Sequence, residues 1–384
     1  MLHAILSAAI LVTLATSAVI LLTRGRRHVE GRQPLPLLEC MALLFTTGLD
    51  VGLVMLPLSE FPTYARDPVY AFANPLAVAF GMWGFLVWGF YFLTTFYFLA
   101  VEPHVRLFER PAIKVVNNVV VIGTCAFTAH LLLQNLPFYA PALPPAVRYA
   151  IVGLTVFLST ATSTHIRYVR VLSVSSTWLF GALVVAMWAA SGMGVGGLTA
   201  SLADLGPYFA HLPRFVLPMS DYHAFYLFWW FSWSIMIGQF VSRFVGRMRT
   251  WQLAAAMLVL PSIPLGTWFA VLWFYFRAQV AVTPALNVAM IVVGIVFVVN
   301  SLDSLIRLYS DNLGWSRARL GTPAYLALHW ILLCALVLAF QVRSLQIEWI
   351  GLVVIGIYAA VYLLLARRWW AAAPARDAAA LVEP

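Results

Sequence analysis

Aromatic side chains crowd the stretch FYLFWWFSW (225–233), and their spacing suits the binding of an organic cation. At about 100° per residue, Tyr226, Trp229 and Trp233 fall on one face of a helix, with Trp230 beside them. Indole is the best cation–π surface, and quaternary ammonium groups are its standard ligands. Arg243, which ends the apolar run, is expected to anchor it at the inner surface near lipid phosphate.

A second aromatic stretch, MWGFLVWGFY (82–91), carries Trp83, Trp88 and Tyr91 on one side of a continuous helix. Glycines between them allow another backbone to approach closely. Interfacial tryptophans belong at helix ends, whereas these lie in mid-span, which favours a binding surface. The alternative is an aromatic face turned toward lipid or the protein core.

Asp50 is the most exceptional residue of the chain, since it lies in the middle of the apolar run TTGLDVGLVMLPLSEF (46–61). A carboxylate at mid-membrane is costly unless it is paired, protonated or hydrated. Gly48, Gly52 and Pro57 weaken the helix around it, and broken helices usually line transport sites. This coincidence favours a functional acid over a structural, hydrogen-bonded one.

A third polar group lies in VVNSLDS (298–304), where Asn300, Ser301 and Asp303 supply oxygen ligands of the kind that Na⁺ requires. A structural interpretation stays open beside it. Small polar residues also hold membrane helices together, and Asp303 can pair with Arg307 four residues later.

The elements that position these residues are transmembrane helices. The chain has 384 residues, of which 63% are hydrophobic and 10% charged, so a soluble domain is excluded. Eleven apolar runs have spanning length: 4–23, 38–60, 73–100, 113–134, 146–165, 176–195, 222–242, 251–275, 283–306, 323–341 and 347–366. We therefore expect a peripheral helix and cytoplasmic loop in 1–34, a core in 35–370, and a cytoplasmic tail in 371–384.

The net charge of +9 follows the positive-inside rule rather than indicating nucleic acid, because most of the 23 Lys and Arg fall in alternate loops. This pattern predicts an N-terminus outside and a C-terminus in the cytoplasm of a bacterial-type inner membrane. The three cysteines lie in apolar spans without metal or disulfide spacing. No HxxxH, P-loop or nucleophile–base set occurs, so we expect neither an enzyme nor a cofactor.

Taken together, these stretches resemble the betaine/carnitine/choline transporter family. GLDVGLVMLPLSEF (48–61) is similar to its broken helix, MWGFLVWGFY to its aromatic-box helix, the stretch 225–250 to its signature helix, and VVNSLDS to its Thr-Ser-Ala-Asp-Ser. The order and spacing agree over nearly the whole chain. The resemblance implies a short, divergent member that lacks the family's first helix and long tails.

The fold implied is an all-α, LeuT-type core of five plus five inverted-repeat helices, with halves at about 38–195 and 222–366. The function implied is secondary transport of a cationic or zwitterionic quaternary ammonium compound, such as an osmoprotectant, by a homotrimer in contact with membrane lipids. Trp83, Trp88, Tyr91 and Trp230 would form the box, and Trp229 and Trp233 the inward exit path. The family's sodium-site positions would be Phe297, Asn300 and Ser301, with backbone around Leu49.

Two departures from the family leave alternatives open. Asp50 replaces a glycine of the broken helix, and Asn300 replaces the sodium-site threonine. The coupling ion is then Na⁺ at a degenerate site or H⁺ on Asp50, unless Asp50 is a counter-charge to the substrate. The rival function is a non-transporting structural subunit of a larger membrane complex.

Overall fold

The computed structural model describes the backbone of residues 1–164 and 167–380, and the side chains of these residues other than 50, 167–170 and 368–380. Within them, ten helices and one bent helix pair are long and apolar enough to cross a membrane, which confirms the eleven predicted spans. The spans are α1 (Leu2–Arg24), α2 (Leu37–Gly48) with α3 (Asp50–Arg66), α4 (Pro75–Trp83) with α5 (Phe85–Phe96), α7 (Pro111–Tyr139), α8 (Pro145–Thr162), α9 (Arg167–Ala190), α12 (Asp221–Val241), α13 (Thr250–Val259) with α14 (Ser262–Arg277), α15 (Pro284–Leu313), α17 (Thr322–Gln341) and α18 (Ile347–Ala380).

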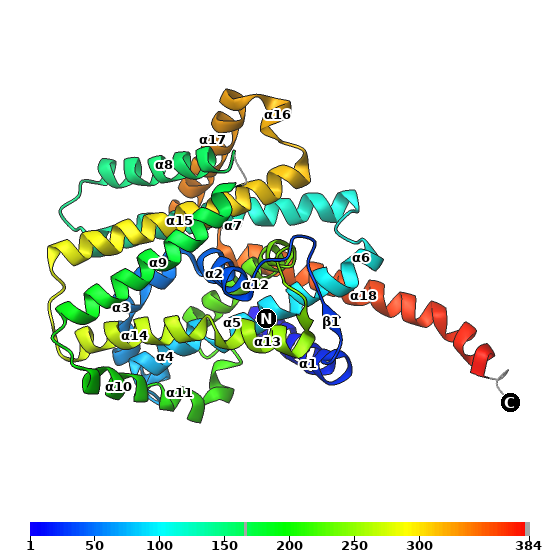
Figure 1. The fold of residues 1–384 in the computed structure, drawn as a ribbon, viewed down its shortest axis with the longest axis horizontal. Helices are drawn as coiled ribbons and strands as arrows, with labels where there is room; N and C mark the ends of the chain where they lie inside the picture. The colour runs from blue at the N-terminus through cyan, green and yellow to red at the C-terminus, as the bar shows by residue number, and fades with distance from the viewer. Residues whose placement is uncertain (165–166, 381–384) are drawn as a thin grey trace.

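Short elements fill the connections between the spans. They are η1 (Pro68–Tyr70), the π-helical η2 (Tyr97–Val101), α6 (Glu102–Val105), α10 (Val195–Ala203), α11 (Gly206–Ala210), η3 (Leu212–Phe215) and α16 (Arg317–Leu320). Helices α10 and α11 lie together at one edge of the bundle, against α14 and α4 respectively (Figure 1). The C-terminal part of α18 extends away from the bundle (Figure 1).

The ten core spans pack in pairs that repeat between the two halves of the chain. In the first half α2 packs on α9, and the corresponding spans of the second half, α12 and α18, pack on each other. Likewise α8 packs on α15, while their counterparts α17 and α7 are in contact. The third span of each half, α7 and α15, meet at the centre. Each half contains five spans. Because this number is odd, the second half begins on the opposite side of the membrane and is inverted relative to the first, as the predicted five-plus-five fold requires.

Helix α12 lies at the centre of this arrangement, and α1 lies at its edge. Of the most apolar part of α12, 89% is buried inside the protein, against 22% for α1. The all-round apolar sequence of α12 explains its position, since a helix that is hydrophobic on every face is buried. Helix α1 packs on α5, α12 and α13.

A short strand pair joins the chain after the C-terminal end of α1 to the chain after the C-terminal end of α12. Strand β1 (His28–Val29) runs antiparallel to β2 (Met248–Arg249). The pairing continues as backbone bonds from the Gly31 N–H to the Val245 carbonyl (2.8 Å) and from the Gln33 N–H to the Arg243 carbonyl (2.7 Å). The arginine-rich end of α12, expected to face lipid phosphate, is thus held by backbone pairing, and Arg243 lies 4.0 Å from Asp311.

Helices α5 and α12 approach closely at Gly238, so that position should not accept a side chain. A Cβ at Gly238 would lie 2.6 Å from the carbonyl carbon of Thr94, whose hydroxyl donates to the Ser234 carbonyl (2.7 Å). We expect Gly238→Ala to destabilise the protein by about 1–3 kcal/mol through overpacking. At Gly181 on α9, where a Cβ meets nothing within 4 Å, Gly181→Ala should stabilise by about 0.5–1 kcal/mol. Thermal unfolding in nanodiscs checks both signs, and a neutral Gly238→Ala would contradict the close approach.

Candidate functional site

The second span breaks at Leu49, between α2 and α3, with a bend of 57°. Side chains from other spans satisfy the backbone carbonyls before this break. The Tyr91 hydroxyl donates to the Gly48 carbonyl (3.0 Å), and the Ser301 hydroxyl donates to the Thr46 carbonyl (3.2 Å). The predicted broken helix is therefore present and supported from α5 and α15. The side chain of Asp50, assigned a role in substrate binding or coupling, lies outside the described side chains.

The predicted ion-site positions on α15 lie beside this break. Asn300 donates its amide to the Thr46 hydroxyl (2.9 Å) and accepts from the Ser173 hydroxyl (3.1 Å). Phe297 packs in an aromatic trio with Phe45 (6.3 Å between centroids) and Phe180 (5.7 Å). The structure thus brings all three residues that the resemblance singled out to the broken helix.

The oxygen atoms at this place fit a hard cation. The Thr46 and Thr47 carbonyls converge on the Ser301 hydroxyl, at 3.2 and 3.5 Å, and the buried Thr47 hydroxyl has no hydrogen-bond partner among the described residues. Carbonyl and hydroxyl oxygens are the ligands that Na⁺ takes at a broken membrane helix. The amide nitrogen of Asn300 points toward Thr46, so its amide oxygen accepts from Ser173 and does not point toward these carbonyls.

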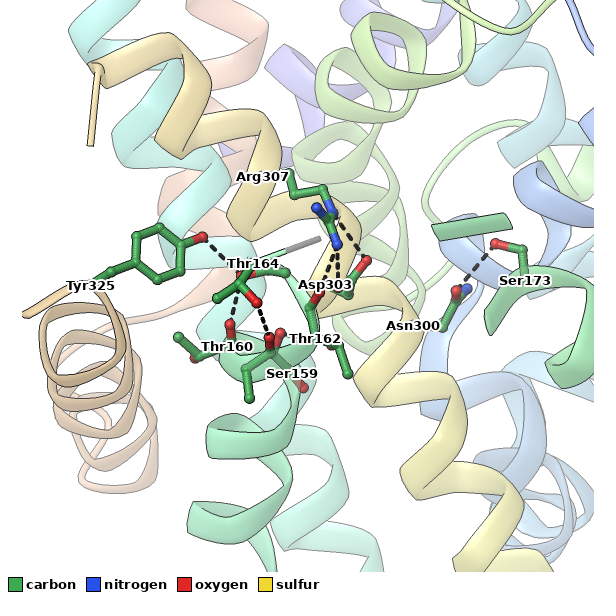
Figure 2. A network of polar contacts seen from close by, with 11 residues as sticks. Ser159, Thr160, Thr162, Thr164, Ser173, Asn300, Asp303, Arg307 and Tyr325 are labelled. Carbon is green, nitrogen blue, oxygen red and sulfur yellow. Dashed lines mark hydrogen bonds and ion pairs between the residues drawn. The ribbon is translucent and has the colours of Figure 1, made fainter. Parts of the chain in front are cut away.

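Asp303 forms a buried ion pair rather than facing the break. Its side chain is fully buried and accepts from two nitrogens of Arg307, at 3.0 and 3.3 Å. Arg307 also donates to the Thr162 carbonyl at the end of α8 (2.7 Å). Figure 2 shows Arg307 between Asp303 and α8, and Asn300 directed toward Ser173 on α9. The i,i+4 pairing considered from the sequence is confirmed, and it ties α15 to α8.

Tryptophans of α4 and α12 converge inside the helix bundle. The Trp83 ring meets Trp230 at 4.9 Å and Trp229 at 5.3 Å between centroids, both edge to face. Trp229 and Trp230 stack at 4.6 Å with 15° between their planes. All three rings are at most 2% exposed, so they touch neither lipid nor water. We call these three residues the tryptophan cluster.

The rings of the tryptophan cluster are in direct contact with one another. Centroid distances of 4.6–5.3 Å are those of packed aromatic pairs, and they leave no space for a methylated ammonium group between the rings. The indole N–H groups are less well satisfied. Trp230 donates to the Met82 carbonyl (2.7 Å), whereas those of Trp83 and Trp229 have no partner among the described residues. The cluster therefore holds buried hydrogen-bond donors that an acceptor would satisfy.

Trp88 and Tyr91 form a separate pair, with centroids 5.7 Å apart. The expected single face of Trp83, Trp88 and Tyr91 is not formed, because the helix breaks at Gly84 (φ −86°, ψ −139°), directly after Trp83. The 100° rotation per residue holds only within a continuous helix, so it does not relate the direction of Trp83 to those of Trp88 and Tyr91 across this break. Trp233 is buried on α12, and among the described ring contacts it makes none with Trp83.

Glu60 was not singled out from the sequence, yet it is a buried carboxylate that accepts three hydrogen bonds. It is 5% exposed and accepts from the hydroxyls of Tyr64 (2.9 Å), Tyr226 (2.6 Å) and Tyr222. The Tyr226 ring in turn contacts Trp83, at 5.7 Å. A sequence signal existed, because Glu60 and Tyr64 are four residues apart, as are Tyr222 and Tyr226.

Two hollows flank this region at opposite ends of the bundle. The first, about 680 Å³, lies where α3 and α14 end and α15 begins, lined by Leu58, Pro62, Arg66, Phe138, Tyr275 and Asn287 among others. The second, about 600 Å³, lies where α12 ends and α7 begins, and its lining includes Arg32, Glu102, Lys114, Gln239, Arg243 and Asn312. The tryptophan cluster belongs to the lining of neither.

Comparison with known proteins gives limited similarity. No family model matches the chain. Uncharacterised transporters of Mycobacterium bovis and Mycobacterium tuberculosis are 33% identical over 84 residues, which are 19% of this chain and only 14% of each relative. A Na⁺-coupled sialic acid symporter, solved in a substrate-bound outward-open state, aligns over 93% of this chain and 81% of its own, with 15% identity and a TM-score of 0.40. The chain is a multi-pass membrane protein by its own helices.

The buried pair of Asp303 and Arg307 leads to a stability prediction. Removing one partner leaves an uncompensated buried charge, so Arg307→Met should lower the free energy of unfolding by about 3–5 kcal/mol. The double variant Asp303→Leu/Arg307→Met should recover a large part of this loss, since neither charge remains. Thermal unfolding measures both. Glu109→Gln, which breaks the exposed pair with Arg106, should change little, and an equal loss in all three variants would contradict the assignment.

Proposed function

We propose that this protein is a secondary transporter of a small quaternary ammonium or related methylated onium compound, of the choline, betaine or carnitine kind. The observation that carries the proposal is the meeting of three buried indole rings from two spans inside the helix bundle. Ring faces are the surface that such a cation binds best, since it cannot donate ordinary hydrogen bonds. Trp88, Tyr91 and Trp233 are buried in the same core and would complete the proposed path.

The unpartnered indole N–H groups favour a zwitterionic substrate. Trp83, Trp88, Trp229 and Trp233 each bury an N–H group without a partner among the described residues. An unsatisfied buried donor costs about 1–3 kcal/mol, so a substrate carboxylate that accepts from one of them would be held there. The same tryptophans could then bind the methylated ammonium group on their ring faces and the carboxylate through the N–H groups at their ring edges.

Binding requires that the rings of the tryptophan cluster separate. Trp83 is the last residue of α4, and the backbone break at Gly84 follows it directly. A rotation at this break moves Trp83 relative to Trp229 and Trp230, which are fixed on the unbroken α12. Alternating access then consists of opening toward the hollow at one end of the bundle and afterwards toward the other.

The proposal keeps two alternatives for the coupling ion, Na⁺ and H⁺. Na⁺ would bind to the Thr46 and Thr47 carbonyls and the Ser301 hydroxyl, next to Phe297 and Asn300, while Asp303 stays in its ion pair. H⁺ is the alternative, carried by a carboxylate such as Asp50. The resemblance supports a homotrimer, and the alternation of basic loops supports an inner-membrane protein with its N-terminus outside and its C-terminus in the cytoplasm.

The second candidate function is a non-transporting structural subunit of a heteromeric membrane complex. The direct contact of the three rings favours it, because a site that has filled with its own side chains binds nothing. This candidate predicts stable co-purification with other subunits from native membranes. A homo-oligomeric particle that accumulates a methylated amine after reconstitution would exclude it.

Substitution of Trp83 tests the proposed site. A desolvated cation–π contact is worth about 2 kcal/mol, so Trp83→Ala should weaken substrate affinity about thirtyfold. Uptake of radiolabelled choline and betaine into proteoliposomes, with and without Na⁺ and pH gradients, measures this. Trp178→Ala is the matched control, since Trp178 on α9 is 76% exposed. Absence of uptake or binding of any methylated amine by the wild type would refute the proposal.

Substitution of Ser301 tests the coupling ion. Ser301→Ala removes one oxygen ligand, so the Na⁺ concentration that gives half-maximal uptake should rise about tenfold, for about 1.4 kcal/mol. The control is Ser175→Ala on α9, an exposed hydroxyl that bonds only within its own helix. Uptake that responds to Na⁺ identically in Ser301→Ala and wild type would remove this site from the proposal.

A further inference from the structure

The carboxylate of Glu60 is buried without a cationic partner. No lysine, arginine or histidine among the described side chains forms an ion pair with it; the contrast is Asp303, whose charge Arg307 neutralises. Its three hydrogen bonds all come from tyrosine hydroxyls, one from its own helix α3 and two from α12. Three donors and no acceptor is the bonding pattern of an ionised carboxylate.

Such a group has two ways to lose its charge inside a membrane, since a buried ion is costly unless it is compensated. It binds a proton, or it binds a cation. Among the described side chains, the titratable groups that face it are tyrosines: Tyr64, Tyr222 and Tyr226 in contact, and Tyr70 on η1 and Tyr139 on α7 further away. These two bond elsewhere, Tyr70 with the Ser220 hydroxyl and Tyr139 to the Met55 carbonyl.

The tyrosines connect Glu60 in two directions. Tyr222 lies in the first turn of α12, is 37% exposed and donates to the buried carboxylate, so its side chain reaches from the protein surface to Glu60. Tyr226 is 1% exposed, donates to the same carboxylate oxygen, and packs against Trp83 (5.7 Å) and Trp229 (5.4 Å). The surface, the carboxylate and the tryptophan cluster therefore form one continuous chain of contacts.

We propose that Glu60 is a proton-binding carboxylate whose occupancy is transmitted through Tyr226 to the tryptophan cluster. A proton reaches Glu60 from surface water when Tyr222 gives its hydroxyl proton to the carboxylate and takes another from water. The carboxyl group then carries its own O–H, so at least one tyrosine stops donating to it. When Tyr226 is that tyrosine, its hydroxyl turns away and its ring moves against Trp83 and Trp229.

The role of this proton in transport rests on the proposed function, whereas proton binding itself does not. In a transport cycle the proton bound at Glu60 from one side would be released to water on the other, with no other bond made or broken. Proton occupancy would then alternate with separation of the rings of the tryptophan cluster.

Infrared difference spectroscopy between acidic and alkaline pH tests proton binding directly in the full chain, reconstituted in lipid. We expect a carbonyl band of a protonated carboxyl group that titrates in the wild type and is lost in Glu60→Gln. The exposed carboxylate of Glu109 supplies the control, since Glu109→Gln should keep the band. A titrating band that survives in Glu60→Gln would overturn the proposal, and so would a Glu60 signal that responds to Na⁺ at constant pH instead.

A second variant covers failure of Glu60→Gln to fold. Tyr226→Phe keeps the carboxylate and removes one donor, so the titrating band should persist at a shifted frequency, and an unshifted band would contradict the link to Tyr226.

A proton gradient directed inward should stimulate betaine or choline uptake in the wild type, and this stimulation should be lost in Glu60→Gln. If the wild type transports nothing, the proposed function fails, while the infrared result still decides whether Glu60 binds a proton.

Discussion

A helix that breaks inside a membrane exposes carbonyl groups that lipid cannot satisfy, and the arrangement of this protein follows from meeting that demand. The carbonyls of Thr46, Thr47 and Gly48 stand at such a break, and hydroxyls from two other spans supply the donors. Helices α5 and α15 must therefore lie against α2 at the depth of the break. A place where carbonyls depend on side chains of neighbouring helices can also exchange those donors for an ion when the helices move.

Much of this architecture could be predicted from the sequence because lipid imposes simple rules. Apolar runs of fixed length gave eleven spans, and the alternation of basic loops supported their number. The clustering of Gly48 and Gly52 located the broken helix, since few residues weaken a membrane helix so strongly. The i,i+4 spacing of Asp303 and Arg307 predicted their ion pair, which depends only on local helix geometry.

Features that depend on contacts between distant segments were not predictable in the same way. The shared face of Trp83 and Trp88 was derived for a continuous helix, and the break at Gly84 changes the phase between them. The grouping around Glu60 needs α3 and α12 side by side, which no local pattern reveals. The convergence of tryptophans from two spans was anticipated, because their rings lie in mid-span, and the resemblance placed Phe297, Asn300 and Ser301 beside the broken helix.

The strand pair between β1 and β2 gives the peripheral helix a mechanical part in any motion of the core. Backbone bonds from residues 28–35 to residues 243–249 join the loop after α1 to the loop after α12, so the C-terminal end of α12 cannot move without moving the end of α1. The pairing extends almost to the end of α1, because the Trp251 N–H donates to the Gly25 carbonyl (3.0 Å) and the Thr250 N–H donates to the Arg27 carbonyl (2.8 Å), which leaves little free chain between α1 and β1. Helix α1, of which little is buried, therefore restricts the movement of α12, which is the more deeply buried of the two.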